Sequence, residues 1–129
     1  MKVMNNDIGT VKQEPEQALY GKVIGIVKDR DQLKSLSDSL ATLGVREVEV
    51  LDGDSGTERL ETWKKTVSQY FFGDMEGKML QRYLDAVAND LIVFAAVVAP
   101  ELADETAGIA KMQGASEIVH FGNSAVTNY

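Results

Sequence analysis

The chain has 129 residues, a net charge of −7 and 44% apolar residues, which is the size and balance of one soluble globular domain. The absence of cysteine excludes disulfides, thiolate metal sites and cysteine nucleophiles, and a single histidine is too few for a His-rich zinc site within one chain. The 13 basic residues are scattered among 20 acidic ones, which disfavours nucleic acid and anionic membrane surfaces as partners.

The N-terminal region carries no targeting pattern. Residues 1–10 lack the apolar core of a signal peptide, and the longest apolar run, residues 91–99, is far shorter than the roughly 20 residues of a membrane span. We therefore expect a cytoplasmic protein with no contact with a membrane. Residues 1–21 are polar and aperiodic, so we expect a leader ahead of a single α/β domain at residues 22–129.

The first regular pattern begins at Lys22. Residues 22–28 form a β-branched run that predicts a buried strand. Asp29 and Gln32 have the spacing of a pair that caps a helix start, and four leucines at steps of three, four and three then predict one apolar helix stripe. Gly44 is expected to end this helix, and residues 47–51 alternate as a strand does.

The same order of elements recurs later in the chain. Residues 91–98 predict a central strand that is apolar on both faces. Pro100 suits the first turn of a helix, whose weaker apolar stripe we expect to include Met112. Gly114 is expected to end that helix, and residues 117–121 predict the last strand.

These two units are related by a constant offset of 70 residues. It relates four pairs of identical residues: Val23 and Val93, Val27 and Val97, Gly44 and Gly114, and Glu47 and Glu117. The matching order of strand, helix, glycine and strand predicts an internal duplication of a βαβ unit. Two such units favour an α+β, ferredoxin-like fold, which is a four-stranded antiparallel sheet with both helices on one face.

An insert of about residues 53–90 separates the two units. Ser55 and Glu58 have a second capping-box spacing, and helical periodicity on both sides of Gly73-Asp74 predicts a helical hairpin. The ferredoxin-like sheet leaves one apolar face bare, which is costly in water. We expect either this insert or a second subunit to cover that face.

These features together resemble the general stress or heat-induced stress proteins, a bacterial family of small α/β proteins. The resemblance covers about residues 22–125 and depends on packing patterns rather than on catalytic motifs. The matching segments are the strand Val23–Val27, the helix ending at Gly44, the strand running into Asp52-Gly53, the segment Tyr70–Asp74 with Tyr83, and the closing His120-Phe121-Gly122. It implies an association with stress physiology without a settled molecular activity, and it supplies no catalytic residues.

The loop at Asp52–Glu58 is the most suggestive candidate site. Its alternate carboxylates and glycines are typical of a calcium loop, which makes Asp52, Asp54 and Glu58 weak candidates for a surface cation site. Trp63 occupies the twelfth position, where an EF-hand-like loop requires an acid, so that interpretation fails. A phosphate loop would require a lysine that is absent here. We expect a turn into a capped helix and no metal.

His120 and Tyr83 are the remaining candidates for chemistry. A histidine acts as acid, base or ligand near neutral pH, and haem ligation through His120 stays open as an alternative. We expect a half-buried structural histidine and no cofactor. An aromatic cluster in the insert is expected to be core, with a ligand pocket as the alternative; its members are Trp63, Tyr70, Phe71, Phe72 and Tyr83.

The sequence thus favours a non-catalytic, stress-associated module that acts through self-association or by binding a protein or small ligand. A symmetric homodimer is the first partner we expect, because pairing removes a sheet face or edge from water. The acids around Glu47 and Glu49 are expected to form a solvated edge that discourages pairing. The alternative is a small enzyme or cofactor-binding protein with a pocket between sheet and insert, to which His120 and Tyr83 contribute.

Overall fold

The computed structural model describes residues 19–69, 74–122 and 125–129. Within those residues the centre is an antiparallel sheet of five strands in the order β3-β4-β2-β5-β6. The strands are β2 (Lys22–Val27), β3 (Val48–Leu51), β4 (Ile92–Val97), β5 (Ser116–Phe121) and β6 (Val126–Asn128).

The middle of the sheet brings together two strands that are distant in sequence. β2 and β4 pair along their whole lengths, from Lys22 opposite Val97 to Val27 opposite Ile92. The expectation that these two apolar strands lie side by side is confirmed. β3 and β6 form the two edges.

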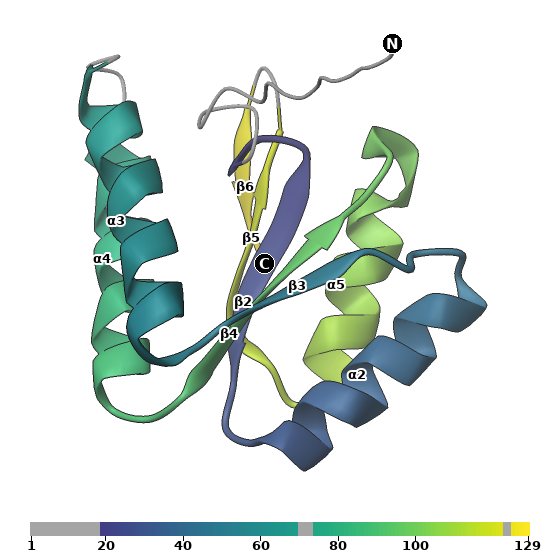
Figure 1. Cartoon of the computed structure of the whole chain (residues 1–129). Coiled ribbons are helices and arrows are strands. Elements are labelled where there is room, and N and C mark those ends of the chain that lie inside the picture. The colour runs from purple at the N-terminus through teal and green to yellow at the C-terminus, as the bar shows by residue number, and fades with distance from the viewer. Residues whose placement is uncertain (1–18, 70–73, 123–124) are drawn as a thin grey trace, which may run out of the picture.

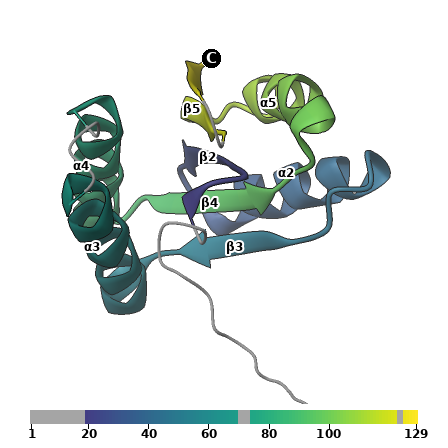
Figure 2. The same ribbon diagram turned by 90° about the horizontal axis from the view of Figure 1, so that it is seen from above.

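Helices cover both faces of the sheet, so the chain forms three layers (Figures 1 and 2). α2 and α5 lie on one face, and α3 and α4 lie side by side on the other. The helical elements are α2 (Arg30–Thr42), α3 (Gly53–Gln69), α4 (Asp74–Ala88), the short 3₁₀ helix η1 (Pro100–Leu102) and α5 (Ala103–Met112).

The burial of β2 shows why its sequence carries no polar side chain after Lys22. Val23 and Val27 belong to the apolar core beneath α2 and α5, whereas Ile24 and Ile26 belong to the core beneath α3 and α4. Successive side chains of a strand point to opposite faces, so a strand covered on both sides has no polar face. The helical insert therefore covers the face that α2 and α5 leave bare.

The start of α2 follows the predicted capping pattern. The Asp29 carboxylate accepts a hydrogen bond from the Gln32 backbone N–H at 2.9 Å, and the Gln32 side-chain oxygen accepts one from the Lys28 N–H at 2.7 Å. Two backbone donors near the helix start are thereby satisfied. The leucine stripe packs on the sheet through three buried members: Leu33, Leu36 and Leu40.

The start of α3 differs from the prediction. The helix begins at Gly53, so Ser55 lies inside its first turn and is not the cap. Gly56 donates its backbone N–H to the Asp52 carbonyl at 3.0 Å. A Cβ atom at Gly56 would lie 2.6 Å from the Leu51 carbonyl carbon, so this helix turn approaches the end of β3 more closely than a side chain permits.

Two further expectations about packing are corrected. Met112 is 86% exposed rather than buried, because the buried face of α5 consists of small residues: Ala103, Thr106, Ala107 and Ala110. The expected polar leader ended at residue 21, yet Leu19 is fully buried in the core beneath α3 and α4.

The sheet also has one strand more than predicted. The expected four-stranded sheet becomes five-stranded because β6 pairs with β5, with Phe121 opposite Val126 and Val119 opposite Asn128. A turn-rich sequence followed by the β-branched pair Val126-Thr127 is typical of a hairpin. That pattern is the signal that predicts β6.

Candidate functional site

The structure places the two candidate residues for chemistry on opposite faces of the sheet. Tyr83 is fully buried in the core beneath α3 and α4. His120 lies opposite Val23 in the β2–β5 ladder, and Val23 faces α2 and α5. Residues directly opposite each other in an antiparallel pair share a face. Tyr83 and His120 therefore cannot act on one ligand within a single chain.

The Tyr83 hydroxyl interacts with the backbone of the sheet. Its hydroxyl donates to the Glu117 carbonyl oxygen at 2.8 Å and lies 3.3 Å from the Ile24 carbonyl oxygen. Burial raises the pKa of the Tyr83 hydroxyl far above its ordinary value, and the nearby Glu117 carboxylate raises it further. A hydroxyl held in its protonated form in this way is a structural donor rather than a general base.

His120 is half-buried on β5. Burial lowers its pKa below the ordinary value of 6.5, and the negative charge of Asp104 partly opposes this shift. Asp104 accepts a hydrogen bond from the Tyr129 hydroxyl at 2.5 Å. At neutral pH the imidazole is therefore uncharged.

The acidic loop forms part of the α3 start. Asp52 makes an ion pair with Arg30 at 2.7 Å, and Asp54 and Glu58 are exposed on the first turns of α3. Across the part of the chain that the structure describes, no three His, Asp or Glu side chains gather in a group that could hold a metal ion.

The aromatic residues of the insert that the structure describes are core residues. Trp63 and Tyr83 are both fully buried between the insert and the sheet. Arg59 lies over the Trp63 ring, 5.1 Å from its centre, and also pairs with Glu49 at 2.8 Å. The predicted cluster members at positions 70–72 lie outside the described residues.

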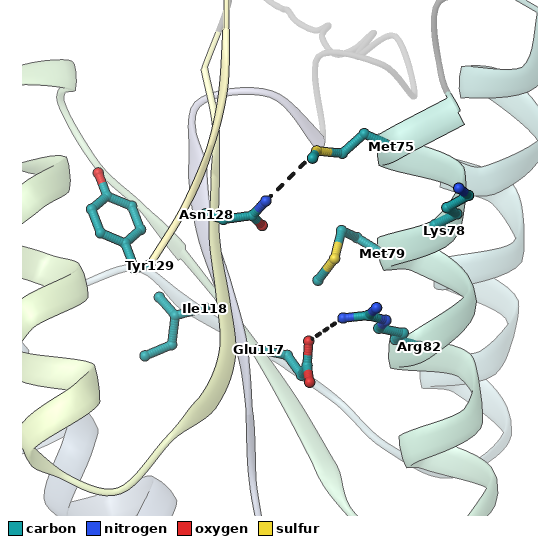
Figure 3. A pocket seen from close by; sticks show the side chains of 8 residues that line it. All are labelled: Met75, Lys78, Met79, Arg82, Glu117, Ile118, Asn128 and Tyr129. Atoms are coloured by element: carbon teal, nitrogen blue, oxygen red, sulfur yellow. Dashed lines mark hydrogen bonds and ion pairs between the residues drawn. The ribbon is translucent and has the colours of Figure 1, made fainter.

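A groove of about 640 Å³ lies beside this core, between α4 and the β5–β6 hairpin (Figure 3). Sequence reasoning did not single out its lining, which comprises Met75, Lys78, Met79, Arg82, Glu117, Ile118, Asn128 and Tyr129. Figure 3 shows Glu117 and Asn128 pointing toward α4, whereas Ile118 and Tyr129 point to the other side of the strands. The residues that line the groove therefore lie on both sides of the β5–β6 hairpin, at the edge of the sheet.

Two contacts hold the walls of the groove together. Arg82 on α4 pairs with the Glu117 carboxylate at 2.8 Å, and the Asn128 side-chain amide lies 3.7 Å from the Met75 sulfur. Met75 is 46% exposed, whereas Met79 is buried deeper in the groove. The groove thus combines an apolar floor with charged groups near its rim.

A β-bulge aims Glu117 into this groove. Ile24 lies opposite Val119 but Ile26 lies opposite Ser116, so β5 has one more residue than β2 across this stretch. Glu117 adopts φ 51°, a left-handed conformation that residues with a side chain rarely take. The Tyr83 hydrogen bond to its carbonyl stabilises that conformation.

Gly25 of β2 faces the bulge. A Cβ atom there would lie 2.9 Å from the Phe94 ring and 3.2 Å from the Ser116 carbonyl oxygen. A side chain at this position would therefore displace the bulge or the ring. The space at Gly25 is therefore matched to the irregular path of β5 at the bulge.

The open side of β6 forms the outer limit of the groove. The Tyr129 N–H donates to the Ile118 carbonyl and the Gly122 N–H donates to the Ala125 carbonyl, both at 2.9 Å. Because ladder bonds alternate along an antiparallel strand, the backbone N–H and C=O groups of Val126 and Asn128 point away from β5. No hydrogen bond joins these outward groups to another described residue.

None of the described helices is long and apolar enough to cross a bilayer. A scan against protein-family models and searches of curated proteins and of solved structures each found no match to this chain.

Proposed function

We propose that this chain is a non-catalytic, stress-associated module that works in the cytoplasm by self-association, through pairing of β6 with β6 of a second copy. The observation that carries this proposal is the outward-facing backbone of β6, which is an edge strand among the described strands and has no charged side chain. The separation of Tyr83 from His120 favours a binding role over catalysis. The stress association itself is an inference from the sequence resemblance.

We also propose that the fold is a ferredoxin-like duplication to which β6 has been added. β4 begins and ends 70 residues after β2, and α5 ends 70 residues after α2. The two helices end with the same hydrogen-bond pattern. The Gly44 N–H donates to the Ala41 carbonyl and the Gly114 N–H donates to the Lys111 carbonyl, both at 3.0 Å. Both glycines have positive φ, as this type of helix ending requires.

The β6 strands of two copies can pair around a two-fold axis. In an antiparallel pair centred on Thr127, Val126 of each copy lies opposite Asn128 of the other. Both residues have outward-facing backbone groups, so the pair forms four hydrogen bonds. At about 0.5–1.5 kcal/mol each, the four bonds provide about 2–6 kcal/mol, which supports only a weak dimer with a Kd on the order of 1 mM.

The test replaces Val126 by proline. Proline removes the outward N–H of Val126 but none of the bonds between β6 and β5, so the fold is retained while pairing is lost. Val50→Pro is the matched control, because Val50 has the same outward-facing position on the β3 edge.

Light scattering over a concentration series up to about 1 mM measures the outcome. We expect the average mass of the unmodified chain to rise with concentration toward twice 14.1 kDa. The mass of Val126→Pro is expected to stay at that of a single chain, and the mass of Val50→Pro is expected to rise as that of the unmodified chain does. A chain that stays monomeric throughout, or a dimer that Val126→Pro retains, contradicts the proposal. Circular dichroism checks that both variants are folded.

A further inference from the structure

The groove between α4 and the β5–β6 hairpin has the dimensions of a small-molecule site. Its volume of about 640 Å³ lies within the usual range of roughly 300–1,000 Å³ for ligand pockets. Its lining does not depend on β6 pairing, because the residues come from one chain. The charges and the apolar groups in it specify the chemistry of a ligand.

One cation of the groove, Lys78, has no ion-pair partner among the described residues. Arg82 and Glu117 neutralise each other through their 2.8 Å ion pair. Lys78 lies one helical turn before Arg82, is exposed, and makes no ion pair with any described residue. In a chain of net charge −7, this groove is a local exception that favours a ligand with a single negative charge.

Two thioethers form the apolar part of the groove wall on α4. Met75 and Met79 are one turn apart on the same helix, the first half exposed and the second buried. Methionine side chains are flexible and polarisable, so they accommodate aliphatic or aromatic groups of different shape. The Asn128 amide, next to the Met75 sulfur, adds one neutral hydrogen-bond donor at the rim.

The strained bulge indicates that this arrangement is specified by the fold. Glu117 keeps a left-handed φ of 51° with the support of a fully buried hydroxyl, and its carboxylate holds Arg82 at the groove wall. Residues in such conformations concentrate at ligand sites, where the surrounding structure offsets the strain. The bulge thus keeps Arg82 paired with Glu117.

We propose that this groove binds an apolar monocarboxylate, with its carboxylate at Lys78 and its hydrocarbon part over Met75 and Met79. Octanoate is a suitable probe, because it combines one negative charge with a flexible aliphatic chain. Octylamine has the same chain with a positive charge, and acetate has the same charge without the chain.

The experiment titrates the full chain, labelled with ¹³C at the methionine methyl groups, with each of the three compounds. We expect octanoate to shift the Met75 and Met79 signals saturably, while exposed Met112 on α5 is unaffected. Acetate and octylamine are expected to bind at least about fivefold more weakly. Assignment uses single Met→Leu variants.

Lys78→Glu tests the charge at the site, and Lys111→Glu on α5 is a control with the same change in net charge. We expect Lys78→Glu to weaken octanoate binding at least about fivefold and Lys111→Glu to leave it nearly unchanged. Absence of saturable binding, octylamine binding as tight as octanoate, or equal weakening by both variants each overturns the proposal.

Discussion

β3 and β6 form the two edges of one sheet, yet they present different side chains to solvent. Beside the outward backbone of β3 lie the acids Glu47 and Glu49, and Glu49 is fixed by its pair with Arg59. The three residues of β6 carry no charge. Open edges are the sites at which chains pair, and charged side chains discourage that pairing. The difference between the two edges supports the proposed pairing through β6.

The strands that adjoin these edges differ as well. β3 pairs with β4 in unbroken register, whereas β5, which carries β6, contains the bulge at Glu117. A regular ladder is stabilised by its own hydrogen bonds, but a bulge leaves backbone groups that need other partners. The backbone at the β5 bulge therefore depends on one side chain of the insert, the Tyr83 hydroxyl.

The largest effect is expected when the acids of the β3 edge are removed. In the double variant Glu47→Thr, Glu49→Thr, both edges can pair, so chains can add to each other without limit. We expect the average mass in sedimentation velocity at high concentration to exceed that of a dimer and to keep rising.

Glu58→Thr, Glu61→Thr is the control, because it makes the same change in net charge on α3. It is expected to form no species larger than the unmodified chain does. If both double variants assemble equally, net charge rather than the β3 edge limits assembly, and the contrast between the two edges is wrong.

The next effect concerns the bulge. Tyr83→Phe removes the donor to the buried Glu117 carbonyl, and we expect a loss of about 1–3 kcal/mol in the free energy of unfolding. Urea denaturation measures this loss. Tyr129→Phe, which removes a hydroxyl donor to the exposed Asp104, is expected to lose less. Equal losses in the two variants would show that the bulge does not depend on Tyr83.

The elements that the sequence predicted are those with a strong local pattern. The β-branched run of β2, the capped leucine stripe of α2 and the apolar run of β4 each determine their own structure through periodicity and burial. The sequence also predicted that the bare apolar face must be covered, because such a face is costly in water, but it left the insert and a second subunit as alternatives. These parts of the fold were predictable.

The groove was not predictable, because its parts are joined only by tertiary contacts. Nothing in the sequence around Glu117 indicates a left-handed φ, since the extra residue of β5 exists only relative to its partner strand. Arg82 and Glu117 are 35 residues apart in the chain. Met112 was misassigned because small alanines, rather than the largest apolar side chain, pack α5 on the sheet.

The smallest effect is expected from His120, the only histidine of the chain, which lies on β5 next to β6. Its pKa is lowered below 6.5 by burial, so the folded chain binds fewer protons than the unfolded chain between the folded pKa and 6.5. Stability therefore rises with pH across that interval and is lost as the pH falls through the folded pKa. NMR titration of the single imidazole measures the folded pKa directly.

His120→Gln provides the comparison, because glutamine keeps a polar side chain that does not titrate. We expect the unfolding free energy of this variant to depend less on pH below 6.5 than that of the unmodified chain, with the two curves parallel at higher pH. A folded pKa at or above 6.5 would mean that the negative charge of Asp104 outweighs burial. The imidazole would then become charged beside β6 in mild acid, and pairing of two copies there would weaken as the pH falls, because like charges would approach across the two-fold axis.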